Sequence, residues 1–185
     1  RPWDTMSRHG GAEFTILASA EIFDPRDSTW TTVQDMDTGR IAHTSTLLPD
    51  GRILVTGGWN LTSSKTSVLF LPDTGRWAPG PDMVDSRFDH SATLLADGRL
   101  LVIGGEDDRD RRLASAEIFD PTKGVWTPAG AMASRRYRHT ATLLQSGLVM
   151  VSGGTSEPGS LASAELFDPS SGAWTKTGAM KTPRQ

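Results

Sequence analysis

The chain has 185 residues, a formal net charge of -3 and no cysteine. This length is enough for one domain with a sizeable hydrophobic core. The 19 Lys and Arg balance the 22 Asp and Glu without long blocks of one sign, which excludes a surface dedicated to polyanions or anionic membranes. We therefore expect neither nucleic acid nor a membrane as a partner. The absence of cysteine also excludes disulfides and thiolate zinc sites.

Internal repetition is the dominant feature of the sequence. Several landmarks recur together with a period of 47 to 49 residues. Glycine pairs begin at Gly10, Gly57, Gly104 and Gly153, tryptophans stand at Trp30, Trp77, Trp126 and Trp174, and arginines stand at Arg40, Arg87, Arg136 and Arg184. The regular spacing predicts a series of similar structural units.

In chain order, the predicted elements begin with an outer pair of strands, at residues 19–23 and around Trp30. Three units of four short strands follow, and no segment has helical periodicity. In each unit a strand with Thr-Leu-Leu leads to a turn at Asp50-Gly51, Asp97-Gly98 or Ser146-Gly147. Such a pair between apolar runs predicts a hairpin in which both turn residues have positive φ.

The second strand of each unit is almost entirely apolar and ends at a glycine pair, which predicts burial on both faces. The third strand resembles Ser-Ala-Glu-Ile-Phe, and the fourth contains the tryptophan. A sheet that is apolar on both faces needs neighbouring units to cover it. We therefore expect the tryptophan to lie between units, and the glycine pair to mark a close approach of two backbones.

This pattern resembles the kelch repeat, in the variety found in bacterial multi-repeat proteins and galactose-oxidase-like propellers. The shared motifs are Arg-x-x-His-x-x-Thr-Leu-Leu, Asp-Gly, an apolar run ending in Gly-Gly, Ala-Glu-Phe-Asp-Pro, Trp and Met, and they cover residues 10–184. The resemblance implies an all-β fold of kelch-type β-propeller blades, each with four antiparallel strands. One copy departs from the pattern, with Val68 in place of Glu and Leu71 in place of Asp.

The repeats predict a single propeller segment over residues 1–185, with three full blades and the outer half of a fourth. An N-terminal extension and the half blade take up residues 1–36, and the full blades take up residues 37–86, 87–135 and 136–185. Kelch rings usually have six or seven blades. We therefore expect the array to belong to a longer propeller, or alternatively to complete a ring with another copy of itself.

Two recurrent polar features invite a chemical interpretation. Histidines recur at His43, His90 and His139, where identical placement in each unit favours an anchor for the first strand over a metal ligand or general base. A glutamate in the third strand should be half buried and in need of a partner. We expect each to pair with the arginine that closes its own blade, in the combinations Glu21 with Arg40, Glu117 with Arg136 and Glu165 with Arg184.

This pairing scheme leaves Arg87 without a carboxylate, because its blade carries Val68. Arg87 would then be free for a ligand, or would simply be an exposed arginine with no role.

The loops after the glycine pairs and the links between blades should lie on one face, where kelch domains usually bind partners. The loops differ most between copies at residues 59–65, 106–112 and 155–160. The carboxylates of 106–112 suit a hard cation, but the interleaved arginines favour a self-paired loop. The candidate binding residues are Trp59, Asn60, Arg87, Asp108, Arg109, Tyr137 and Arg138, with Trp59 and Tyr137 as aromatic platforms for sugar or peptide.

The function expected from this pattern is non-catalytic binding of a protein or carbohydrate ligand, with no catalytic residue, metal or cofactor assigned. The enzymatic alternative has two forms. Copper-radical oxidation needs a Cys-Tyr cofactor, which a chain with no Cys and one Tyr does not supply. A sugar mutarotase activity, of the sialic-acid type, is the other, and no motif for it can be placed. A third alternative is a purely structural, homo-oligomeric repeat array.

Overall fold

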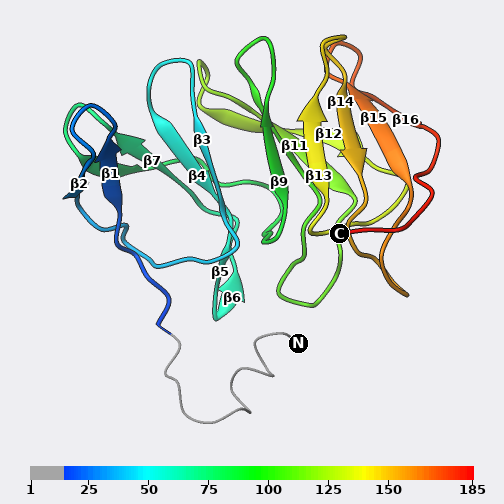
Figure 1. Ribbon diagram of the computed structural model, residues 1–185, viewed down its shortest axis with the longest axis horizontal. Coiled ribbons are helices and arrows are strands. Elements are labelled where there is room, and N and C mark those ends of the chain that lie inside the picture. Colours follow the sequence, from blue (N-terminus) through cyan, green and yellow to red (C-terminus); the bar gives the residue numbers. More distant parts are fainter. Residues whose placement is uncertain (1–14) are drawn as a thin grey trace.

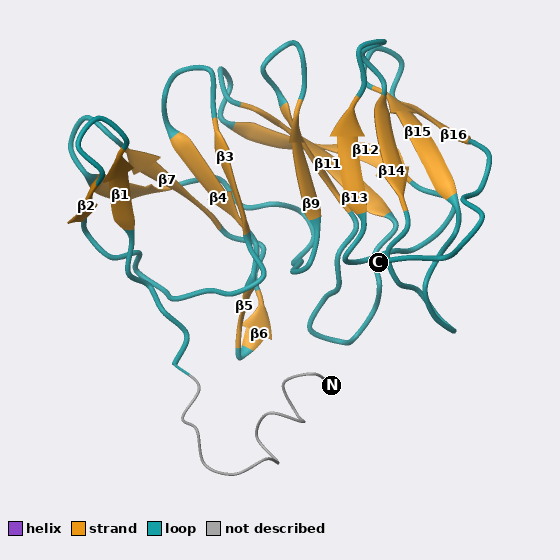
Figure 2. Cartoon of the chain, in the orientation of Figure 1, coloured by secondary structure: helices purple, strands orange, loops and turns teal. Residues whose placement is uncertain are grey.

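The computed structural model describes residues 15–185. The glycine pair at Gly10 and the predicted extension at residues 1–9 lie outside this part of the chain. The regular structure of the described residues consists of strands, without helix, as Figure 2 shows. None of the described residues belongs to a helix that is long and apolar enough to span a membrane. The predicted all-β fold class is confirmed.

Three antiparallel sheets of four strands form the body of the molecule, and a two-stranded sheet precedes them (Figure 1). The two-stranded sheet consists of β1 (Glu21–Asp24) and β2 (Thr29–Thr32). The three complete blades are β3 (Thr44–Leu47), β4 (Ile53–Thr56), β7 (Ser67–Leu71) and β8 (Arg76–Pro79); β9 (Ser91–Leu94), β10 (Leu100–Ile103), β11 (Ser115–Asp120) and β12 (Val125–Ala131); and β13 (Thr140–Leu143), β14 (Val149–Ser152), β15 (Ala164–Asp168) and β16 (Ala173–Lys176). Each blade pairs its strands in chain order, as the repeats predict.

Two details differ from the prediction. The segment 59–65, expected to be a loop, contains a short hairpin of β5 (Trp59–Asn60) and β6 (Thr62–Ser63).

In the Asp-Gly turns only the glycine has positive φ, for example 86° at Gly51, so the expected pair of positive φ values was wrong. The turn is longer than two residues: the Gly51 amide donates to the Leu48 carbonyl, and the Leu48 amide donates to the Arg52 carbonyl. A longer loop needs the left-handed conformation only at its last residue.

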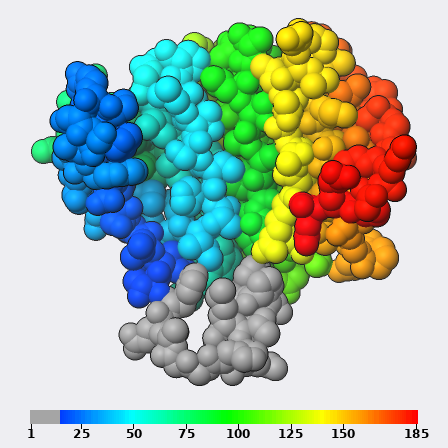
Figure 3. All heavy atoms as spheres, in the orientation of Figure 1, coloured from blue at the N-terminus to red at the C-terminus, as the bar shows by residue number. Residues whose placement is uncertain are grey.

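The core lies between the blades. All four residues of β10 are fully buried, and successive side chains point to opposite faces of the sheet. Leu101 and Ile103 pack in one cluster with Phe167 of the following blade, whereas Leu100 and Val102 pack in another with Leu54 of the preceding blade. The middle blade is therefore covered on both faces by its sequence neighbours, and Figure 3 shows the blades as a succession of colours in chain order across the molecule.

The fourth-strand tryptophans link each blade to the one before it. The indole N–H of Trp126 donates to the Pro81 carbonyl at 3.1 Å, and that of Trp174 donates to the Ala129 carbonyl at 2.9 Å. The glycine pairs allow a second close approach between blades. At Gly57, where φ is +61°, a Cβ would collide with the backbone carbonyl of Arg87. Both sequence interpretations agree with this geometry.

The chain reverses direction on two opposite faces (Figure 1). The Asp-Gly turns lie on one of them, which we call the turn face. The loops after the glycine pairs lie on the other with the links between blades, and isolated bridges join the two sets at Ile41–Trp59, Phe88–Glu106 and Tyr137–Thr155. We call this second surface the loop face. Its backbone is thus fixed to the blades at regular intervals.

Burial between blades should dominate stability. Phe119 is 1% exposed, whereas Phe23, at the same repeat position in β1, is 45% exposed. We expect Phe119→Ala to lower the free energy of unfolding by about 3–5 kcal/mol, through lost burial and the cavity left behind. Phe23→Ala should cost about 1 kcal/mol or less. Urea unfolding followed by circular dichroism measures both, and equal losses would contradict the proposed location of the core.

Candidate functional site

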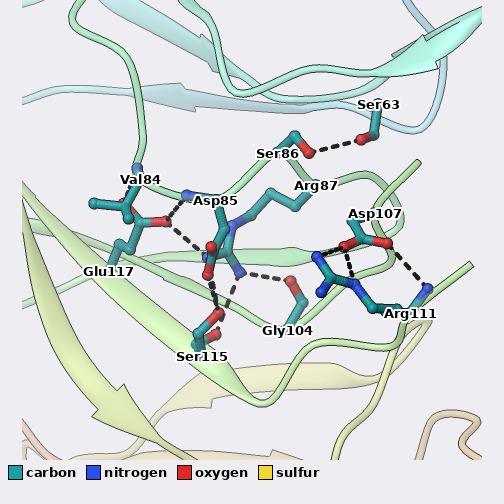
Figure 4. A network of polar contacts seen from close by, with 10 residues as sticks. All are labelled: Ser63, Val84, Asp85, Ser86, Arg87, Gly104, Asp107, Arg111, Ser115 and Glu117. Carbon is teal, nitrogen blue, oxygen red and sulfur yellow. Dashed lines mark hydrogen bonds and ion pairs between the residues drawn. The ribbon is translucent and has the colours of Figure 1, made fainter. Parts of the chain in front are cut away.

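A buried arginine stands at the entrance of each blade. Arg87 is 0% exposed, and its Nη1 donates to the carbonyls of Gly104 at 2.6 Å and Ser115 at 3.2 Å. Its Nη2 donates to Glu117 Oε1 at 2.8 Å, as Figure 4 shows. The guanidinium therefore ties the link before the blade to the glycine corner after β10 and to the third strand, β11.

The Glu117 carboxylate is fully engaged in return. Its Oε2 accepts a hydrogen bond from the Val84 amide at 2.7 Å, and its Oε1 accepts one from the Asp85 amide at 3.1 Å. A second carboxylate, that of Asp85, lies 3.6 Å from Arg87 Nη2. Two backbone donors and one guanidinium thus compensate a side chain that is only 2% exposed, which meets the requirement for burying a charge.

The last blade repeats the arrangement. Arg136, 0% exposed, donates to the Gly153 carbonyl at 2.8 Å and to Glu165 Oε1 at 2.9 Å. The Glu165 carboxylate accepts the amides of Ala133 at 2.6 Å and Ser134 at 3.1 Å. The same four groups therefore recur in both blades that carry the glutamate.

The predicted pairing scheme was wrong by one blade. Each glutamate pairs with the arginine that precedes its blade, not with the arginine that follows it. The preceding arginine lies beside the glycine pair of the same sheet, as Arg87 lies beside Gly104. Arg87 is consequently a buried structural residue, neither free for a ligand nor exposed. Of the other expected partners, Glu21 and Arg184 are exposed.

The arginine whose blade carries the valine is Arg40. It is 7% exposed and donates through Nη1 to the Gly57 carbonyl at 2.9 Å. Its remaining contacts are long, at 3.4 Å to the carbonyl and to the hydroxyl of Thr66. Among the described residues no carboxylate forms an ion pair with it. Burial lowers the pKa of Arg40, with no acidic neighbour acting in the opposite direction.

A cavity of about 210 Å³ adjoins Arg40 on the loop face. Two predicted candidates, Trp59 and Asn60, belong to its lining. The complete set is Thr38, Gly39, Arg40, Trp59, Asn60, Thr62, Ser63, Ser64 and Thr66. The sequence singled out the aromatic and the amide but missed Arg40, although the valine at position 68 was the signal that could have identified it.

A second group of predicted residues meets farther along the loop face. The guanidinium groups of Arg112 and Arg138 each lie 5.5 Å from the centre of the Tyr137 ring. Arg138 is held by Asp89 at 2.8 Å, and Arg112 is held by Glu157 at 2.7 Å. These contacts join loops 45 and 49 residues apart, so the sequence, which singled out the loop 106–112 as self-paired, gave no sign that Arg112 meets Glu157 or that Arg138 meets Asp89.

The loop 106–112 is organised by one carboxylate. Asp107 accepts the amides of Arg109 and Arg111 and forms an ion pair with the Arg111 guanidinium at 2.6 Å. The candidates Asp108 and Arg109 are exposed. Within residues 15–185, acidic and histidine side chains form no group of three or more that is arranged to hold a metal ion.

The histidines lie between blades, and none of them lines the cavity beside Arg40. His90 Nε2 is 3.0 Å from the Thr44 hydroxyl, and His139 Nε2 is 2.8 Å from the Ser91 hydroxyl, so that each reaches the first strand of the preceding blade. Burial, assisted by nearby arginines, lowers the pKa of His139 to about 3 and that of His90 well below its ordinary value. Both imidazoles are therefore neutral at physiological pH.

A larger cavity, of about 350 Å³, lies on the turn face between the hairpin turns. Its acidic residues already have partners: Asp50 forms an ion pair with Arg52, Asp97 with Arg99 and Asp120 with Lys123. The loop face thus differs from the turn face, because it alone presents a cavity beside a buried cation without a carboxylate.

Removing one partner of the buried ion pair between Arg136 and Glu165 should destabilise the fold. Glu165→Val gives Arg136 the surroundings of Arg40, and we expect it to lower the free energy of unfolding by about 3–5 kcal/mol, since a buried charge loses its partner. Asp50→Asn, at an exposed pair, should cost about 1 kcal/mol or less. Chemical denaturation of both variants tests this, and a loss for Glu165→Val no larger than the control would overturn it.

Comparisons with known proteins agree with this geometry. Residues 88–133, which span the second complete blade, match the family model described as Kelch motif. The solved structure of YjhT superposes with a TM-score of 0.73 at 15% identity, covering 91% of this chain and 67% of that one. No curated protein matches the chain. The chain is thus built of kelch-type β-propeller blades, with a kelch motif in its second complete blade.

Proposed function

We propose that this chain is a non-catalytic binding scaffold that holds a protein or carbohydrate ligand on its loop face. A kelch propeller fold supports a binding role of this general kind. The observation that carries the proposal is the arrangement around Tyr137, whose ring is half buried and flanked by two arginines that carboxylates hold in place.

This arrangement has the properties of a recognition surface. Aromatic and arginine side chains contribute most to binding at interfaces, particularly when they are immobilised beforehand. The ion pairs of Arg138 with Asp89 and of Arg112 with Glu157 orient the two guanidinium groups across neighbouring blades, although the Glu157 side chain is 81% exposed. The bridge between Tyr137 and Thr155 fixes the backbone beneath the ring. A ligand therefore meets a surface that needs little ordering.

The enzymatic alternative has less support. The strongest pKa shifts at potential acid or base groups belong to His90 and His139, and burial between blades is their main cause. Neither cavity described above has a histidine or tyrosine in its lining, and the carboxylates of the larger one, Asp50, Asp97 and Asp120, are each paired with an arginine or lysine. A sugar mutarotase or an oxidase relative would need such groups to converge on a substrate.

Glycan arrays and a displayed random-peptide library, screened with the intact chain, test the proposal. We expect Tyr137→Ala to weaken binding of the selected ligand about tenfold or more, because a central aromatic anchor is lost. Lys123→Ala, at an exposed position on the turn face, is the matched control and should leave affinity unchanged. Loss of binding in the control but not in Tyr137→Ala would refute the assignment of the loop face.

One observation favours a second role, assembly with another copy. The two-stranded sheet exposes Ile22, Phe23 and Trp30, at 40%, 45% and 64% of their surfaces. Equivalent residues in the complete blades are covered by a neighbouring sheet, as for Phe119 and Trp126. We therefore propose that a second copy can cover this sheet and extend the ring.

Light scattering after size-exclusion chromatography measures this assembly. The wild-type chain should have an integral multiple of the single-chain mass, and Trp30→Glu should return it to the mass of one chain because the charge opposes burial of the sheet. Thr31→Glu, in the same strand, is the control. A single-chain mass for the wild type at high concentration would refute the assembly.

A further inference from the structure

Arg40 occupies the position of Arg87 and Arg136 but has lost the acidic groups of that position. Val68 pairs with Val55 in the register in which Glu117 pairs with Val102. Thr38 replaces Asp85, the second carboxylate near Arg87. The Arg40 side chain is nevertheless buried at the same position, since it is 7% exposed, against 0% for its counterparts, and bonded to the Gly57 carbonyl at 2.9 Å.

The backbone donors of the missing carboxylate are still present. In the other blades the glutamate accepts the amides of Val84 and Asp85, or of Ala133 and Ser134. The equivalent amides belong to Asp37 and Thr38, the first and second residues after Met36, as Val84 and Asp85 are after Met83. Hydrogen bonds within residues 15–185 do not include either amide as a donor. These two N–H groups, on the exposed residues Asp37 and Thr38, and the Arg40 guanidinium thus hold the repeat positions that bind a carboxylate in the other blades, without a protein acceptor among the described residues.

The position that the glutamate carboxylate occupies in the other blades is also open to solvent in this one. Val68 is half buried, whereas Glu117 and Glu165 are 2% exposed, so the shorter side chain leaves its surroundings accessible. The cavity of about 210 Å³ has Arg40, Thr38 and Thr66 in its lining, and so adjoins this place from the loop face, although Val68 and Asp37 are not part of the lining. Hydroxyl groups make up much of the remainder: Ser63 already donates to the Ser86 hydroxyl and Ser64 is bonded to Thr66, whereas the exposed Thr62 hydroxyl can donate to a further oxygen of a ligand.

We propose that this cavity, which we call the Arg40 pocket, binds the carboxylate group of a ligand in the place that glutamate holds in the other blades. A carboxylate fits the donors: in the neighbouring blade one oxygen accepts a single amide at 2.7 Å, and the other accepts an amide at 3.1 Å and the guanidinium at 2.8 Å. One negative charge also neutralises one buried arginine. A doubly charged anion would leave an excess charge in a largely buried place.

Binding has a clear energetic origin. A buried cation without a counter-ion is unfavourable, and a hydrogen bond between charged groups in a sheltered place is stronger than one in water. A ligand carboxylate therefore relieves a cost that the fold itself bears. The inference deepens the proposed function, because the pocket lies on the loop face, but it depends on residues separate from the Tyr137 cluster.

Titration of the ¹⁵N-labelled chain with sodium acetate, followed by amide chemical shifts, tests the proposal directly. We expect saturable shifts at Asp37, Thr38 and the Arg40 side chain, and none with acetamide, which has the same shape without the charge. Sulfate is a second probe. Shifts with sulfate equal to or larger than those with acetate would overturn the carboxylate assignment, as would the absence of saturable shifts with acetate.

Val68→Glu is the decisive variant, because it restores the pattern of the other blades. The introduced carboxylate should occupy the place and weaken acetate binding about tenfold or more. Val68→Gln has the same volume without the charge, so a higher melting temperature for Val68→Glu than for Val68→Gln would show that Arg40 accepts a carboxylate there. Val68→Thr, which is isosteric with the natural residue, should keep acetate binding. Unchanged acetate binding in Val68→Glu would refute the proposal.

The source of the carboxylate is distinguished with two further ligands. N-acetylglutamate represents an acidic peptide side chain and glucuronate an acidic sugar, with N-acetylglutamine and glucose as their neutral counterparts. Tighter binding of one acid than of acetate identifies the source through the additional contacts of the hydroxyl-lined wall. A neutral ligand that binds at Tyr137 while no acid binds at Arg40 would refute this inference and leave the proposed function standing.

Discussion

The arginine at the entrance of each blade is the contact on which the rest of the structure depends. Its guanidinium joins three parts of the chain that are remote in sequence: the link between blades, the corner at the glycine pair and the third strand. Because a buried guanidinium needs several acceptors at fixed distances, it allows only one arrangement of these parts. The direction in which each loop leaves the blade follows from that arrangement.

The blades themselves are held together by simpler means. Apolar second strands such as β10 are buried on both faces, and the tryptophans bond to carbonyls of the preceding blade. The copies differ most on the loop face, where the backbone bridges keep differing loops in register.

The repeats are informative where they fail to match. Val68 and Thr38 remove the acidic surroundings of one arginine but leave its position and its backbone donors unchanged. A purely structural repeat would gain from replacing such an arginine as well, since an unpaired buried charge is destabilising. The persistence of Arg40 beside an open cavity is the physical reason for regarding the Arg40 pocket as a binding site rather than a defect.

By itself the sequence determined the all-β class, the strand order within each blade and the position of the tryptophans between blades, because periodicity and turn residues are local properties. It also predicted the loop face and two lining residues, Trp59 and Asn60. Only the tertiary structure decided which arginine each glutamate meets, and so moved the unpaired cation from Arg87 to Arg40. Each glutamate lies between two arginines of the repeat, and the actual partner, about 30 residues before it, is farther along the chain than the one that follows it, so sequence distance favours the wrong choice. The choice depends on where the chain enters the sheet, which is a property of the folded blade.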